Sequence, residues 1–137
     1  SFSILKFALA HHPNLRHTFV YSNKTCSDVI YRDALTQLAL QHPDRVKIIH
    51  ALTREERAAA PGTSLKKGRV DLALLKEAIP DPTNCLVYVC GPGISRFDLA
   101  AASATGSKPQ PRFLASVLSD LKQLGVPAAA IRRESYG

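Results

Sequence analysis

Residues 85–92 have the sequence CLVYVCGP, an unbroken apolar run that stops at a glycine and a proline. A run of this length and character is typical of a strand inside a parallel sheet, because helices cover such a strand on both faces. We therefore predict a central strand over residues 85–90, ended by the turn formers Gly91, Pro92 and Gly93.

Helical and strand patterns alternate on both sides of this run. The helical stretches have apolar residues three or four positions apart, and the strands are short and rich in β-branched or aromatic residues. Strands that alternate with helices form right-handed crossovers, so the predicted fold class is α/β, a Rossmann-like doubly wound parallel sheet with helices on both faces. The predicted helices cover residues 3–11, 29–41, 72–79 and 113–124, and the predicted strands cover residues 16–22, 46–52, 85–90 and 130–134.

The segments between these elements carry further predictions. Ser27 or Asp28 is available as the N-cap of the second helix, whose apolar face would include Ile30. Residues 53–68 lose their periodicity and gain proline and glycine, which predicts a surface loop. Residues 94–111 are rich in alanine and serine, with a first half suited to a helix and a second half suited to a loop.

Length and composition limit the classes of protein to consider. A chain of 137 residues has the size of one domain, and 45% hydrophobic residues are too many for intrinsic disorder. No apolar run approaches the roughly 20 residues that cross a bilayer, so no membrane span is predicted. The 18 Lys and Arg residues exceed the 11 Asp and Glu residues and give a net charge of +7, which attracts anions. The basic residues are dispersed, with no run of five, so nucleic-acid binding is not predicted.

Cysteine and histidine usage argues against metal sites and disulfides. Cys26, Cys85 and Cys90 are odd in number and have no zinc-ligand spacing. The five histidines also lack a metal-binding pattern, so no metal is predicted. A reducing, cytoplasmic location is the expectation that follows from free thiols.

Candidate site residues follow the predicted strands, because ligands of open parallel sheets bind at the carboxyl ends of the strands. Hydroxyl groups and two cations after the first two strands suit a ribose or a 2′-phosphate, although polar residues are also common in any solvated loop. A small residue and a glycine after the third strand allow a flat ring to approach the backbone, although a strand-end cysteine is more often a small buried residue. The four segments are Ser22 to Thr25, Thr53 to Glu55, Cys90 to Pro92, and Ser135 with Tyr136.

Six motifs in a fixed order carry a resemblance to a known family. Together they resemble the nicotinamide-nucleotide-binding domain of the ferredoxin–NADP reductase superfamily of flavoenzymes, over nearly the whole chain. The motifs are SILKFALA at residues 3–10, D-[IV]-x-[YF]-x-[DE]-x-L at residues 28–35, HALTRE at residues 50–55, GRV at residues 68–70, VYVCGP at residues 87–92, and L-G-[VI]-P…E-x-[YF] at residues 124–136.

The resemblance implies a function and a role for each candidate residue. Residues 1–137 would be the NAD(P)H-binding domain of a reductase that passes hydride to FAD and then electrons to an acceptor protein or domain. Cys90 would lie against the nicotinamide, in a contact shaped by Gly91 and Pro92, and Glu134 and Tyr136 would lie near the flavin and nicotinamide. The adenosine end would be lined by Ser22, Asn23, Lys24, Thr53 and Arg54.

The chain also departs from the family pattern. In the family, the first strand and the G-x-G-x-x-P loop that follows it come before the helix in which residue 1 of this chain lies. The flavin-binding barrel, which holds most of the FAD, also comes before that helix. The resemblance therefore implies the C-terminal half of a longer reductase, with the first strand of the sheet missing. Residues 93–111 form an insertion, for which a lid, a partner-docking segment and a passive surface elaboration are all open.

Two further questions are left open by the residues. A non-catalytic or regulatory relative that binds a nucleotide or a partner is the alternative function. Lys24 and Arg54 suit the 2′-phosphate of NADPH, whereas the S-N-K-T turn at residues 22–25 also resembles NADH-using relatives, so the nucleotide preference is undecided.

Overall fold

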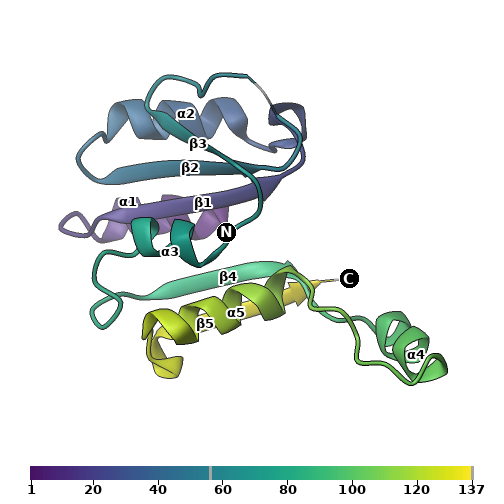
Figure 1. The fold of residues 1–137 in the computed structure, drawn as a ribbon. Helices are drawn as coiled ribbons and strands as arrows, with labels where there is room; N and C mark the ends of the chain where they lie inside the picture. The colour runs from purple at the N-terminus through teal and green to yellow at the C-terminus, as the bar shows by residue number, and fades with distance from the viewer. Residues whose placement is uncertain (56, 137) are drawn as a thin grey trace. The chain divides into compact units, whose positions relative to one another are not determined.

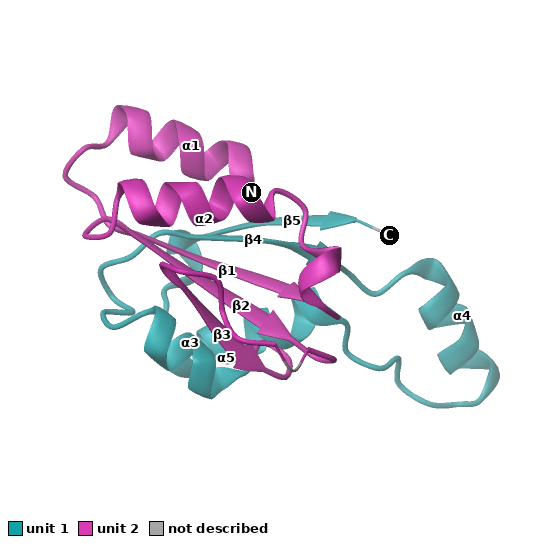
Figure 2. Ribbon diagram, turned by 90° about the horizontal axis from the view of Figure 1, so that it is seen from above, with its two compact units in different colours: residues 1, 71–137 teal, residues 2–70 magenta. Residues whose placement is uncertain are grey.

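The computed structural model describes residues 1–55 and 57–136 and consists of two compact units. Unit 2 comprises residues 2–70, and unit 1 comprises residue 1 and the residues from 71 onward (Figure 2). Within the described residues, no helix has both the length and the apolar character that crossing a membrane requires.

Unit 2 is built around a parallel sheet with the strand order β1-β2-β3 (Figure 1). The register of β1 and β2 pairs His17 with Val46 and Asn23 with Leu52, so both strands end at the same level. The elements of this unit are α1 (Phe2–His11), β1 (His17–Asn23), the short 3₁₀ helix η1 (Cys26–Asp28), α2 (Arg32–Gln41), β2 (Val46–Leu52) and β3 (Thr63–Lys67).

Helices α1 and α2 cover one face of this sheet (Figure 2). Their apolar stripes meet the side chains of β2 that point to that face, because alternate residues of a strand face the same side. The core of the unit includes Leu5 and Leu9 of α1, Leu35 of α2, and Ile48 and Leu52 of β2. The predicted first two helices and first two strands are therefore present, and the core is formed mainly by α1, α2 and β2, because the side chains of β1 are only partly buried.

The second predicted helix begins later than expected. Asp28 does not cap it, because its carboxylate accepts hydrogen bonds from the Thr25 backbone N (2.9 Å) and hydroxyl (2.8 Å) and closes η1 instead. The chain then turns through Tyr31, whose φ of 62° lies in the left-handed region, before α2 starts at Arg32. Ile30 lies outside the helix and is 62% exposed, so its predicted place on the apolar face is wrong.

The prediction of a loop over residues 53–68 is also wrong in part. Residues 63–67 form β3, which pairs in parallel with β2 from Ile48↔Thr63 to Leu52↔Lys67. Leu65 is the one apolar residue of this strand, and it packs against the core of unit 2. The strand is therefore formed through its pairing with β2 rather than through an apolar pattern of its own.

His50 is buried at the centre of β2, with a relative exposure of 6%. Its register partners are Tyr21 of β1 and Leu65 of β3, and within the described residues its Nδ1 atom has no hydrogen-bond partner. Burial lowers the pKa of His50 below the usual value for histidine, and the positive charge of Arg32 lowers the pKa further.

We expect this histidine to make the chain less stable in acid. In the unfolded chain a histidine titrates near pH ~6.5, whereas in the folded chain it stays neutral to lower pH, so between the two pKa values the unfolded chain binds more protons. The free energy of unfolding should therefore have its full value above the pKa of histidine in the unfolded chain, and it should fall as the pH drops below that pKa. Urea unfolding at several pH values measures this slope, which should be shallower in His50→Gln and unchanged in the control His11→Gln, at an exposed position of α1. Equal slopes in all three proteins would contradict the prediction.

Unit 1 contains a second parallel pair, β4-β5, covered on one face by α5. Helix α5 packs against both β4 and α3, and it ends at Gly125, whose φ of 95° is the left-handed conformation typical of a helix C-terminus. The predicted helices over residues 72–79 and 113–124 are confirmed. The elements are α3 (Leu72–Ala78), β4 (Val87–Pro92), α4 (Arg96–Ala104), α5 (Phe113–Leu124), the 3₁₀ helix η2 (Ala128–Ala130) and β5 (Ile131–Tyr136).

The strand predicted from the opening motif differs from the prediction in two respects. It runs through Gly91 to Pro92 instead of stopping at Cys90, because β5 continues to pair with it as far as Pro92↔Tyr136. The expected cover on both faces is wrong for Tyr88, whose side chain is 52% exposed, whereas Val89 is buried. An apolar run therefore does not by itself show how much of a strand is covered.

Candidate functional site

In unit 2, the segments that follow β1 and β2 are hydrogen-bonded to each other. Beyond the last strand pair, the Thr53 backbone N donates to the Asn23 carbonyl oxygen at 3.2 Å, and the Arg54 N donates to the Lys24 carbonyl oxygen at 2.8 Å. Five of the predicted site residues, Ser22, Asn23, Lys24, Thr53 and Arg54, therefore lie together at the carboxyl edge of the sheet. Lys24 and Arg54 are both exposed and place two positive charges there.

Strand β3 adds a cation to this edge that the sequence analysis missed. Lys67 pairs with Leu52 in the register, so it lies beside the segment that begins at Thr53. The next residue, Gly68, donates its backbone N–H to the Leu52 carbonyl oxygen at 2.8 Å and has a φ of 115°. The sequence signal was the lysine pair at residues 66–67 in front of a glycine, but it has meaning only once residues 63–67 are recognised as a strand.

Glu55 clamps the loops that carry these residues. Its side chain is buried, with Oε2 accepting from the Cys26 backbone N at 2.8 Å and Oε1 accepting from the Arg57 backbone N at 3.1 Å. Burial raises the pKa of the Cys26 thiol, and the hydrogen bond with Glu55 raises it further. Cys26 is therefore a neutral, buried side chain, and the carboxylate beside it acts as a structural link between the segments after β1 and β2.

Replacement of this carboxylate should cost stability. Glu55→Ala leaves the buried N–H of Cys26 without its acceptor, which costs about 1 to 3 kcal/mol of unfolding free energy. Glu55→Gln retains one acceptor oxygen and should lose less. Chemical unfolding provides the measurement, with Asp44→Ala, at an exposed carboxylate, as the control. A Glu55→Ala protein as stable as the control would show that the clamp contributes nothing.

Asn23 presents an unused donor at the same edge. Its side-chain Nδ2 is buried and has no hydrogen-bond partner within the described part of the chain. Buried donors are nearly always paired, so this amide fits a ligand that brings an oxygen acceptor. The hydrogen bonds from Thr25 lower the pKa of the nearby Asp28, with a smaller effect from the charges of Lys24 and Arg54.

In unit 1, the parallel register brings four predicted residues to one face. Cys90 pairs with Glu134 and Pro92 pairs with Tyr136, and paired residues of a parallel sheet point to the same side. The residues between them, Gly91 and Ser135, point to the other side. Glu134 is exposed, as is 60% of Tyr136, and Cys90 is partly buried. These residues belong to separate sequence motifs, and the strand pairing places them side by side.

Gly91 points to the face of β4 that α5 covers. A Cβ atom on Gly91 would overlap Cδ1 of Phe113 and would lie 2.7 Å from its Cε1 atom, closer than side chains approach each other. On this face the space beside Gly91 is therefore filled by the ring of Phe113, and the approach of a ligand ring to the Cys90–Pro92 segment stays a prediction. A glycine at this position is required by the packing of α5, and its role in cofactor binding is still a prediction.

The predicted site residues thus form two groups. Those assigned to the adenosine end belong to unit 2, and those assigned to the nicotinamide and flavin belong to unit 1. Among the residues that the structure describes, no group of three or more side chains is suited to hold a metal ion.

Parallel strands joined by helices, with polar and cationic residues at their carboxyl ends, define an α/β domain of the nucleotide-binding type. The chain belongs to the oxidoreductase NAD-binding domain family, whose model matches residues 1–97. The predicted resemblance and the predicted fold class are confirmed by this match and by the similarity of the chain to a solved structure of the same fold.

Relatives of known activity are similar over different parts of the chain. NADH-cytochrome b5 reductase 1 of Lodderomyces elongisporus is 38% identical over 95 residues, which cover 67% of this chain and 30% of the relative. The ferredoxin reductase component of 3-ketosteroid-9-alpha-monooxygenase of Mycobacterium tuberculosis is 32% identical over 139 residues, which cover 98% of this chain and 34% of the relative. The NADH nitrate reductase of Lotus tetragonolobus is 34% identical over 73 residues, which cover 53% of this chain and 43% of the relative.

A solved structure shares the fold. The CS-b5R domains of human Ncb5or in the NAD+ form superpose with a TM-score of 0.65 at 26% identity. The match covers 96% of this chain and 32% of that structure. The chain thus spans less than half the length of each relative described here.

Proposed function

We propose that residues 1–137 form the NAD(P)H-binding domain of a flavin-dependent reductase that passes hydride from NAD(P)H to FAD and then electrons to an acceptor protein. The observation that carries the proposal is the register of β4 and β5, which places Cys90, Glu134 and Tyr136 on one face of a domain of the NAD-binding family. The names of the relatives, which include reductases of cytochrome b5 and a ferredoxin reductase component, support this reaction class.

The adenosine end of the nucleotide would be held by unit 2. The buried Nδ2 of Asn23 would donate to a ribose or phosphate oxygen, and the Ser22 and Thr53 hydroxyls would add donors. Lys24, Arg54 and the newly found Lys67 would contribute positive charge at the same edge, which favours the phosphates. The Glu55 clamp would keep these segments in place before the nucleotide arrives.

The nicotinamide end would be held by unit 1. Cys90 would contact the ring and limit its position, and Pro92 would restrict the backbone beside it. Glu134 and Tyr136 would supply a carboxylate and a hydroxyl for hydrogen bonds to the cofactors. The bound cofactors supply the hydride and electron transfer, so the task of these side chains is to orient them and exclude water.

Anaerobic reduction of the full-length gene product tests the proposal. The purified protein should contain bound flavin, and the flavin absorbance should bleach when NADH or NADPH is added. Oxidised cytochrome b5 and an oxidised ferredoxin, added separately, then identify the type of acceptor. A colourless protein that binds nucleotide would favour the non-catalytic alternative, and a protein that binds neither nucleotide would contradict both.

We also propose a cytoplasmic location. The support is that all three cysteines are free thiols, as is usual in a reducing compartment. Imaging of the tagged full-length gene product in its native cells tests this, and a signal confined to a secretory compartment would contradict it.

A further inference from the structure

The end of β4 is held from the face opposite Cys90. Cys90 points to one side of the β4-β5 pair, and Gly91 points to the other side, where the ring of Phe113 fills the space that a Cβ atom would occupy. Gly91 is itself buried, so the ring and the backbone are in close contact. Any shift of Phe113 would change the space available to the strand segment that carries Cys90 and Pro92.

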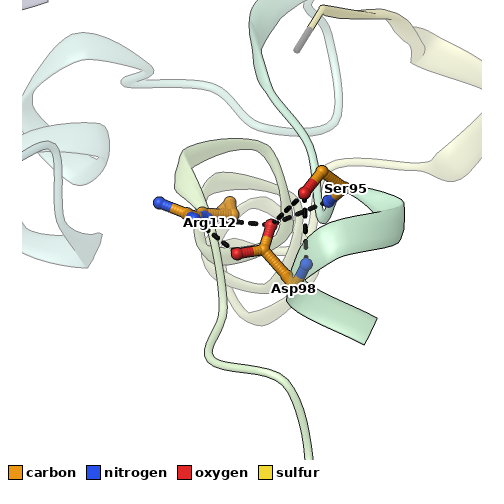
Figure 3. Close-up of polar contacts among 3 residues, drawn as sticks. All are labelled: Ser95, Asp98 and Arg112. Carbon is orange, nitrogen blue, oxygen red and sulfur yellow. Dashed lines mark hydrogen bonds and ion pairs between the residues drawn. The ribbon is translucent and has the colours of Figure 1, made fainter. Parts of the chain in front are cut away.

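The position of Phe113 is set by the start of α5. It is the first residue of that helix, directly after the N-cap residue Arg112. The Arg112 guanidinium makes two hydrogen bonds to the Asp98 carboxylate, one of them from Nε to Oδ2 at 3.2 Å (Figure 3). A paired, two-point contact of this kind sets the orientation of the guanidinium as well as its distance.

Asp98 is in turn held by the N-terminus of α4. Its Oδ2 accepts from the Ser95 backbone N and hydroxyl, both at 2.8 Å, and the Ser95 hydroxyl accepts from the Asp98 backbone N, which forms a capping box (Figure 3). The bonds from Arg112, followed by those from Ser95, hold the pKa of Asp98 well below its usual range. The carboxylate is therefore charged at any physiological pH.

Helix α4 contributes little packing of its own. Ala102 is its one buried residue, Phe97 is 71% exposed, and the helix projects from the rest of unit 1 (Figures 1 and 2). An isolated helix of nine residues is marginal in water, so its capping box and its contact with Arg112 carry much of its order. The inserted residues 93–111 are thus connected to the start of α5 through Asp98 and Arg112.

We propose that Phe113 is a positioning residue for the reductase reaction and that the Asp98–Arg112 pair holds it in place. The ring supports the strand end at Gly91, so that Cys90 is presented at a fixed position. The insertion then stabilises the position of the Cys90–Pro92 strand end, rather than acting as a lid or a passive elaboration. This inference rests on the proposed function for its kinetic consequence, but the Phe113–Gly91 contact itself does not depend on that function.

A double-mutant cycle in the full-length gene product tests the contact. Gly91→Ala inserts a methyl group into the ring of Phe113, and Phe113→Ala leaves a cavity, so each should lower the midpoint of thermal unfolding. In the double variant the new methyl group occupies part of that cavity, so the double variant should be more stable than the sum of the two losses predicts. Additive losses would overturn the proposed contact. Phe113→Leu serves in place of Phe113→Ala if the latter fails to fold.

Stopped-flow reduction of the flavin tests the positioning role. Phe113→Ala should slow hydride transfer about tenfold, because a displacement well below 1 Å is already felt at this step, while the dissociation constant for ADP stays within about twofold. Arg112→Ala should produce a smaller loss in the same direction. The matched control is Phe97→Ala, which removes an exposed phenylalanine from the same insertion and should leave the rate unchanged.

The possible outcomes separate this inference from the proposed function. Hydride transfer that is equally fast in Phe113→Ala, Phe97→Ala and the parent would overturn the positioning role. If the parent protein itself transfers no hydride, the proposed function fails and the positioning role fails with it. The unfolding cycle would still show whether Phe113 and Gly91 are coupled in that case.

Discussion

The double variant Lys24→Ala, Arg54→Ala is expected to bind NADPH about 100-fold more weakly, with a change of at most about threefold for NADH. Each cation would make a charge-assisted hydrogen bond to the 2′-phosphate, which NADH lacks, and such bonds are typically worth about 1.5 to 3 kcal/mol. Both side chains are exposed, so the lower figure applies, and two such bonds sum to about 3 kcal/mol. Titration of the full-length gene product with each nucleotide, followed by flavin fluorescence or calorimetry, gives the two dissociation constants.

A charge-matched control is available for this variant. Arg16→Ala, Lys122→Ala also removes two exposed cations, from residues that precede β1 and lie in α5, and should leave both affinities unchanged. Equal losses of NADPH and NADH affinity in the Lys24, Arg54 variant would show that these cations do not recognise the 2′-phosphate. Lys67 is the natural third position to test, because the register of β3 places it beside Thr53 and Arg54.

Cys90→Ala is expected to slow hydride transfer by about 10- to 100-fold with little change in stability. The side chain is small and half-buried, so its loss leaves only a small cavity. The rate should fall because the nicotinamide would lose a contact that limits its position, and a misplacement of about 1 Å can cost a factor of about 100. Stopped-flow reduction under anaerobic conditions measures the rate, and thermal unfolding verifies the fold.

Cys85→Ala is the matched control for this second variant. Cys85 precedes β4, so it lies at the opposite end of the strand from Cys90. Its thiol donates to the Pro82 carbonyl oxygen at 3.4 Å. Its replacement should leave the rate of flavin reduction unchanged. If Cys90→Ala is as fast as Cys85→Ala, Cys90 is a packing residue with no part in the reaction.

Much of the local structure was predictable because it depends on neighbours in the sequence. The helix over residues 113–124 follows from an apolar stripe and a stop at Gly125, and the helix after Asp71 follows from a side chain that caps it by accepting from the Leu74 N–H at 2.8 Å. The strand over residues 46–52 follows from a short β-branched run. These signals act within a few residues, so a sequence contains them in full.

The predictions were wrong where residues distant in the sequence determine the local structure. Residues 63–67 have one apolar side chain among five, and they form β3 because β2 offers free backbone groups and a place for Leu65. The start of α2 moved because Asp28 bonds to Thr25 instead of capping the helix. Tyr88 is exposed although it belongs to an apolar run, since the side of a strand that is covered depends on which helix packs there.

The sequence by itself determined the α/β class, the family and the residue types at each strand end, because apolar periodicity and motif order are properties of the chain alone. The tertiary structure decided which of these residues meet. Strand register places Cys90 beside Glu134 and Lys67 beside the Thr53 segment, and packing places Phe113 against Gly91. The physical reason is that pairing and packing join residues that are tens of positions apart, and their partners are chosen by the free energy of the whole fold rather than by any local pattern.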